Sequence, residues 1–95
     1  MRLTIPNDVV FRTVGDEAVI LNFTTGQYHG LDAVGSRIWE LLTAMGSQQR
    51  ACERLVEEFD ADPDRLRVDV DELVSQLVRR GLLAVSEDGE PAGRG

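Results

Sequence analysis

The side chains best suited to nucleophilic or metal chemistry are one histidine, His29, and one cysteine, Cys52. Neither lies in a CxxC or HExxH spacing, so the sequence does not predict a zinc site. A Cys–His nucleophilic pair is one interpretation, but Cys52 falls in the apolar stripe of a predicted helix, where a buried, unreactive thiol is usual. His29 lies in a predicted strand and needs no catalytic role there. We therefore expect no enzymatic activity, no metal and no cofactor.

Nucleotide and acid-base sites have equally little support. The glycines at positions 26, 30 and 35 form no GxGxxG, and no GxxxxGK[ST] is present. The carboxylates between residues 53 and 72 are spread along predicted helices, as on a solvated surface. Asp69 and Glu72 are the pair that could still contact a ligand.

Composition narrows the functional classes further. The 95 residues suit one domain, and the net charge of -7 opposes general nucleic-acid binding, which needs a basic surface. No apolar run is long enough for a membrane-spanning helix, and the N-terminus lacks a secretion signal. One cysteine cannot form an internal disulfide, so we expect a cytoplasmic protein.

Three strands are predicted first, at residues 9–14, 18–23 and 27–31. The first two are β-branched and aromatic, and the links at Gly15-Asp16 and Thr24-Thr25-Gly26 are turn sequences. Because short links leave sequential strands adjacent, the sequence predicts an antiparallel meander.

Three amphipathic helices are predicted next, with N-caps at Asp32, Ser47 and Asp62 and a stop at Gly46. The apolar spacing of each helix fits one buried face: Val34, Ile38, Leu41, Leu42 and Met45; then Ala51, Cys52, Leu55, Val56 and Phe59; then Leu66, Val70, Leu73, Val74, Leu77 and Val78. We also expect Trp39 in the core. The predicted fold is α+β and winged-helix-like, a three-stranded antiparallel meander followed by a three-helix bundle. We expect one domain over residues 1–85 and a disordered tail over 86–95.

The outer edge of the third strand is the feature to which we assign function. A meander leaves its first and third strands with one free edge each, and proteins usually block such edges with Pro or Lys. Residues 27–31 contain neither. Strand addition by a peptide is a standard use of a free edge. Gly30 fits either a close approach of another backbone or a kink before the helix.

A cleft is expected if the third helix lies beside this edge. Its candidate walls border the apolar stripe of that helix: Asp69, Glu72 and Gln76 on one side, and Arg67, Val68, Asp71 and Ser75 on the other. Periodicity leaves open which side faces the strand.

The order of these features resembles the PqqD-like proteins called RiPP recognition elements. The similar segments are VILNFTTGQYHGLDAVGSRIWELL and FDADPDRLRVDVDELVSQLVRRGLL, within residues 9–85. Among the subgroups, the first segment is most similar to the small stand-alone proteins of lasso-peptide gene clusters.

The resemblance implies that a precursor's leader peptide adds as a strand beside the third strand and packs on the third helix. It also implies delivery of that precursor to a separate leader protease and a ring-closing cyclase. Carried over by position, the peptide-binding residues are Gln27, Tyr28, His29, Gly30, Leu31, Val68, Asp69, Glu72, Leu73 and Gln76. Tyr and Pro anchors of the leader would be received by Val68 or Leu73 with Tyr28.

Two other functions stay open. One is a PqqD-type peptide chaperone of another RiPP or quinone-cofactor pathway. The other is a winged-helix DNA-binding regulator, which the acidic charge and the lack of a basic helical stripe oppose.

Overall fold

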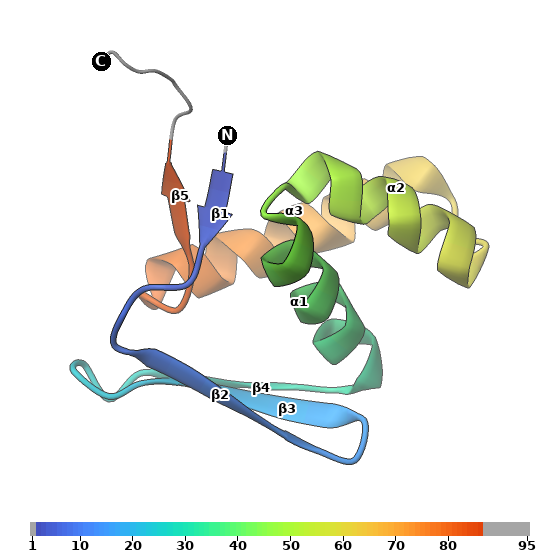
Figure 1. Cartoon of the computed structure of the whole chain (residues 1–95). Helices are drawn as coiled ribbons and strands as arrows, with labels where there is room; N and C mark the ends of the chain where they lie inside the picture. Colours follow the sequence, from blue (N-terminus) through green and yellow to red (C-terminus); the bar gives the residue numbers. More distant parts are fainter. Residues whose placement is uncertain (1, 87–95) are drawn as a thin grey trace.

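The computed structural model describes residues 2–86, which form two small sheets and three helices (Figure 1). The strands are β1 (Arg2–Thr4), β2 (Val9–Val14), β3 (Glu17–Asn22), β4 (Tyr28–Leu31) and β5 (Ala84–Ser86). The helices are α1 (Ala33–Met45), α2 (Gln48–Phe59) and α3 (Pro63–Arg79). The predicted α+β fold, a meander followed by three helices, is confirmed.

The meander is the sheet β2-β3-β4, with β3 in the middle. Ile20 at its centre pairs with Phe11 on one side and with His29 on the other. The two links turn at Gly15 (φ 65°) and Gly26 (φ 80°), in the left-handed region that glycine enters most easily. β4 begins at position 28, one residue later than predicted.

β1 and β5 form a second, two-stranded sheet that stands beside the end of α3 (Figure 1). Arg2 pairs with Ser86, and Leu3 pairs with Val85. Ser86, which was expected to begin the tail, is therefore the last residue of a strand. The rest of that expected tail, residues 87–95, lies outside the described residues.

All three predicted N-caps are present. The side chain of Asp32 accepts the Gly35 N–H at 2.8 Å, and Ser47 and Asp62 cap α2 and α3 in the same way. α1 ends at Gly46, whose left-handed φ of 64° lets its N–H bond to the Leu42 carbonyl. These local signals needed no tertiary help, which is why the sequence predicted them.

The core is one cluster in which the inner face of the sheet, the three helices and the segment after α3 meet. Its largest fully buried side chains are Trp39, Ile20, Leu42, Leu55, Leu77, Leu82, Leu83 and Val70. Three predictions of burial were wrong: Val34 is 52% exposed, Phe59 is 41% exposed and Val78 is 39% exposed. All three lie in the first or last turn of their helices. No helix within residues 2–86 has the length and apolar content to cross a bilayer.

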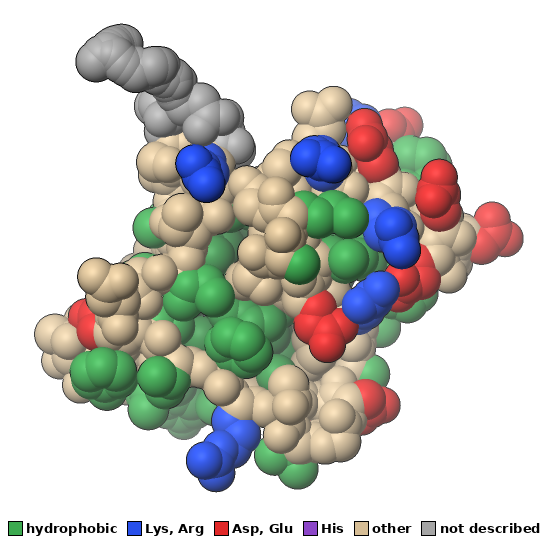
Figure 2. Space-filling view, viewed as in Figure 1, with side chains coloured by type: hydrophobic (Ala, Val, Ile, Leu, Met, Phe, Trp, Pro, Cys, Tyr) green, Lys and Arg blue, Asp and Glu red, His purple; other side chains and the backbone are tan. Residues whose placement is uncertain are grey.

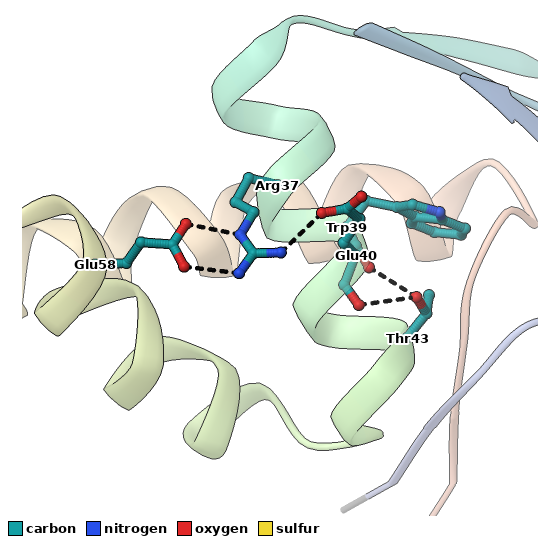
Figure 3. A network of polar contacts seen from close by, with 5 residues as sticks. All are labelled: Arg37, Trp39, Glu40, Thr43 and Glu58. Carbon is teal, nitrogen blue, oxygen red and sulfur yellow. Dashed lines mark hydrogen bonds and ion pairs between the residues drawn. The ribbon is translucent and has the colours of Figure 1, made fainter. Parts of the chain in front are cut away.

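An ion-pair network ties α1 to α2 (Figure 3). Arg37 donates from Nε and Nη2 to the two carboxylate oxygens of Glu58, each at 2.7 Å, and from Nη1 to Glu40 at 2.9 Å. The hydrogen bonds from Arg37 lower the pKa of Glu58. Because the pair is solvent-exposed, it adds little to the free energy of folding.

Candidate functional site

The free edge of β4 carries outward-facing backbone groups. In an antiparallel pair, residues alternate between bonding to the neighbouring strand and pointing away from it. The Asn22 N–H donates to the Gln27 carbonyl at 2.9 Å, so every second residue from Gln27 onward bonds to β3. The N–H and C=O groups of Tyr28 and Gly30 therefore point away from the sheet.

β2 forms the opposite free edge. The Phe23 N–H donates to the Asp8 carbonyl at 3.0 Å, so the same alternation turns the backbone groups of Phe11 and Thr13 outward. Both sheet edges are thus open for pairing, and the two edges differ in the elements that lie beside them.

The edge of β4 borders a hollow. This hollow of about 320 Å³ is lined by Gly26, Gln27, Tyr28, His29, Gly30 and Arg80. Arg80, the C-cap of α3, donates from Nη1 to the Tyr28 carbonyl at 3.3 Å. That carbonyl is one of the outward-facing groups. The C-terminal end of α3 therefore lies beside the free edge.

Asn22 holds this arrangement together. It is only 4% exposed, and its Nδ2 donates to the Gly81 carbonyl at 2.9 Å, which joins the end of β3 to the end of α3. Its Oδ1 accepts the N–H groups of Thr24 and Thr25 at 2.9 and 3.1 Å. One buried amide thus shapes the turn into β4 and sets the position of the helix end next to it.

The side of α3 that faces β4 follows from helical geometry. Each residue advances about 100° around the axis, which puts Asp69, Leu73, Gln76 and Arg80 on the same side of the buried stripe. Arg67 and Asp71, on the other side, line a groove shared with α2. Since Arg80 contacts Tyr28, its side of the helix is the one nearest β4.

The helix residues predicted to bind the peptide therefore fall into two groups, those on the β4 side of α3 and those that face elsewhere. Leu73 and Gln76 are half-buried and lie on the β4 side, and Asp69 lies on that side nearer the start of the helix. Glu72 lies further round towards solvent. Val68 is 63% exposed and lies opposite the buried stripe, away from β4. Of the two candidate walls, the one with Asp69 and Gln76 is on the same side of α3 as Arg80, which contacts β4.

The side chains of β4 alternate between two faces. Tyr28 pairs with the exposed Leu21, so its ring lies on the face away from the helices. His29 and Leu31 face the helices. Burial and the nearby Arg80 lower the pKa of His29. Tyr28 and Leu73 were expected to receive ligand side chains together, but the Tyr28 ring lies on the outer face of the sheet, whereas Leu73 belongs to α3 on the other side.

The outer face of the sheet exposes an apolar row across all three strands. The register aligns Val10, Leu21 and Tyr28, which are 50%, 36% and 64% exposed. Val19 and Val14 extend the row along the strands. Hydrophobic side chains are visible along this layer in Figure 2, with one basic side chain projecting from it, whereas most of the charged side chains in this view gather over the helices. The register places Arg12 on the same face, opposite Val19. An uncovered apolar face of this kind marks an interaction surface.

Cys52 and His29 do not share a site. Cys52 lines the α2–α3 groove, of about 450 Å³, whereas His29 lines the hollow at β4. Burial raises the pKa of the Cys52 thiol, with Asp71 adding to the shift, and both effects disfavour a reactive thiolate. Within residues 2–86, no three His, Cys, Asp or Glu residues group as a metal site would require.

Sequence reasoning did not identify Asn22 or Arg80 as parts of the site. An Asn that ends an apolar strand just before Thr-Thr-Gly is a signal for a side-chain-capped turn. Its bond to Gly81, 59 residues away, has no local signal. Arg80 follows Arg79 at the end of the last helix, where cations are common because they complement the helix dipole, so the sequence does not set it apart.

The chain matches a known protein family and is similar to solved structures. The family model described as coenzyme PQQ synthesis protein D (PqqD) matches residues 17–83. The structure of TbiB1 in complex with the TbiA(beta) leader peptide is 34% identical, with a TM-score of 0.80 over 90% of this chain and 99% of that one. A lasso peptide synthetase B1 complexed with its leader peptide is 18% identical and shares the fold, with a TM-score of 0.79 over 90% and 100% of the two chains. None of the curated proteins matches the sequence.

Proposed function

We propose, from the premise that this chain belongs to the PqqD family, that it binds the leader peptide of a ribosomally made precursor of the lasso-peptide type. The relative that is 34% identical was solved with a leader peptide, and its chain is covered almost completely. The leader adds as a strand to the edge of β4, where main-chain hydrogen bonds provide affinity.

The observation that carries this proposal is the pair of outward-facing residues on β4. Tyr28 and Gly30 together offer two N–H donors and two C=O acceptors to an incoming strand. The outer face at Gly30 is also open, since no atom lies within 4 Å of the position that a Cβ would occupy. The pairing of Gly30 with Val19 is regular, without a bulge. The edge of β4 is therefore straight at Gly30 and open to an added strand.

Side-chain recognition uses both faces of the added strand. Leader residues opposite Tyr28 and Gly30 point to the outer face and extend its apolar row. Leader residues between them point to the helices, towards His29, Leu73 and Gln76. An apolar anchor on that side packs against Leu73, which is partly buried at the border of the core.

We infer that the protein acts by binding and presentation and catalyses no step. The thiol of Cys52 has a raised pKa, and the imidazole that could activate it lies in a different hollow. A Cys52→Ala variant should therefore leave maturation of the precursor unchanged. Loss of maturation with normal leader binding would contradict this inference.

The partners beyond the leader are a leader protease and the cyclase of the same pathway. We infer that the protease docks on the outer face of the sheet. There the added leader strand would continue the apolar row of Val10, Leu21 and Tyr28, so that carrier and leader form one surface. Such a partner contacts the carrier and the leader at once, and so engages the loaded form in preference to the empty one. We expect these steps to take place in the cytoplasm.

Binding of a fluorescently labelled synthetic leader, taken from the precursor encoded beside this gene, tests the function. Anisotropy should saturate at low micromolar protein or below, the affinity range of specific peptide recognition. Folded protein that leaves the leader unbound at about 100 µM, a range of negligible specific affinity, would exclude the function.

A quinone-cofactor pathway is the second candidate, because the family description names coenzyme PQQ synthesis. The same assay separates the two candidates when the precursor peptide of that cofactor replaces the lasso leader. Tighter binding of the cofactor precursor would favour the second candidate.

A further inference from the structure

Arg80 is the one Arg, Lys, Asp or Glu side chain that lines the hollow along β4. Arg80 is exposed, and its neighbours in the hollow are backbone groups, Gln27, Tyr28 and His29. The lowered pKa of His29 favours its neutral form. The ion pairs formed within residues 2–86 join Arg37 to Glu40 and Glu58, and none includes Arg80. The hollow is therefore a cationic spot on a chain of net charge -7.

The hydrogen bonding of this guanidinium is far from saturated. Its side chain makes one contact within the described part of the chain, the 3.3 Å bond to the Tyr28 carbonyl. Charge-assisted hydrogen bonds are usually about 2.7–2.9 Å long, and a guanidinium has five N–H donors. Arg80 thus has capacity for a stronger acceptor than the carbonyl it now contacts.

Strand addition changes what Arg80 can contact. An incoming strand needs the Tyr28 carbonyl for its own N–H, so the backbone of the leader competes with Arg80 for that acceptor. The leader residue paired with Tyr28 turns its side chain to the outer face. The residues next to it turn their side chains towards the helices, where Arg80 and His29 lie.

The side of α3 that carries Arg80 has an electrostatic polarity along its length. Asp69 lies eleven residues before Arg80 on the same side of the helix, which corresponds to about 16 Å at 1.5 Å per residue. A carboxylate in the leader is attracted to the Arg80 end and repelled from the Asp69 end. The charge pattern thus selects one register and one direction for the added strand.

On the basis of the proposed function, we propose that Arg80 is a specificity-determining residue for leaders with an acidic side chain. With the edge empty, it covers the Tyr28 carbonyl and so guards the strand against unwanted pairing. With the leader bound, it forms an ion pair with an Asp or Glu adjacent to the leader residue that pairs with Tyr28.

A double-mutant cycle tests the proposal. The labelled leader is compared with variants in which each Asp and Glu is changed singly to Asn or Gln, on wild-type protein and on Arg80→Gln. One carboxylate should account for a roughly three- to tenfold loss of affinity for wild-type protein, the range for an exposed charge-assisted pair. The same leader substitution should cost less than twofold on Arg80→Gln, and Arg80→Lys should recover part of the loss.

Arg79→Gln is the matched control, because Arg79 lines a different groove with Val78 and Val85. It removes the same charge from the next position and should leave the dependence on the leader carboxylate unchanged. Thermal unfolding of both variants establishes that they are folded.

The alternative outcomes separate this inference from the function on which it rests. If the leader binds and every carboxylate variant binds equally well, or if the bound leader has no acidic residue, Arg80 does not set specificity and leader binding stands. Equal coupling in Arg79→Gln and Arg80→Gln would reduce the effect to net charge and overturn the inference. A leader that does not bind wild-type protein contradicts the proposed function itself.

Discussion

At the scale of single residues, two polar side chains, Asn22 and Arg80, set the geometry of the site. Asn22 joins the turn before β4 to the end of α3, and Arg80 reaches from that helix end to the Tyr28 carbonyl. Both contacts span more than 50 residues of sequence. The geometry of the edge therefore depends on a buried amide that has no catalytic or ligand-binding chemistry of its own.

Changing Asn22 to Asp separates its two roles. The carboxylate can still accept the Thr24 and Thr25 N–H groups, but it cannot donate to the Gly81 carbonyl and places an oxygen against it. We expect a loss of about 2 kcal/mol in unfolding free energy, the penalty for an unsatisfied buried group, and weaker leader binding. Urea unfolding measures the first effect and anisotropy the second.

Asn22→Ala removes both roles and is the comparison. It should destabilise the protein at least as much as Asn22→Asp and should also loosen the turn. If both variants unfolded at the wild-type urea concentration, Asn22 would not be the link between sheet and helix.

The titration of His29 reports on its neighbour. Because it is the only histidine, its ring signals in an NMR titration are unambiguous. The pKa of His29 is lowered first by burial and then by Arg80, so Arg80→Gln should raise that pKa while leaving it below the usual 6.5. An unchanged pKa would mean that the guanidinium does not lie near the imidazole in solution.

The same shift gives the direction of the pH dependence of stability. A folded-state pKa below 6.5 means that the unfolded chain binds the proton more readily. The contribution of His29 to stability is therefore complete above pH 6.5 and is lost as the pH falls through the folded-state pKa.

At the scale of elements, the two edge strands are similar in pairing and different in surroundings. β4 has α3 and a hollow beside its outward groups, whereas β2 has its apolar residues exposed along both faces. The strand edge and the helix end form one slot because Gly81 and Asn22 hold them together.

Proline scanning of the two edges distinguishes them. Gly30→Pro removes an outward N–H of β4 without breaking a bond to β3, as an edge strand tolerates. We expect the Kd for the leader to rise about tenfold or more, since one backbone hydrogen bond is lost and the ring obstructs pairing. Anisotropy measures the change.

Thr13→Pro is the matched control on β2, where residue 13 also turns its N–H outward. It should leave leader binding unchanged. The opposite pattern, with binding lost in Thr13→Pro and kept in Gly30→Pro, would move the leader to the β2 edge. His29→Pro is not a suitable probe, because that N–H bonds to β3 and its loss would damage the sheet.

Local chemistry made most of this architecture predictable. Caps such as Asp32 and turn glycines such as Gly26 act over a few residues, and so the order and approximate bounds of the elements followed from the sequence. Val34 was misplaced because periodicity identifies a helical face and cannot show where the facing layer ends. The wall of the slot depended on Arg80 meeting Tyr28, a contact between elements that no local pattern encodes.

At the scale of the whole molecule, a one-sided sheet explains the combination of fold and function. The helices cover one face, and the other face and both edges are exposed (Figure 1). An added leader would make a fourth strand, cover the edge of β4 and widen the apolar outer face. One binding event would thus both secure the leader and complete a surface for the next protein.

Backbone hydrogen exchange with and without the labelled leader tests the central claim most directly. If the leader pairs with β4, the amides of Tyr28 and Gly30 should become strongly protected, while those of Phe11 and Thr13 on β2 should exchange as before. Protection of Phe11 and Thr13 instead, or a bound leader that protects neither pair, would contradict strand addition at the edge of β4.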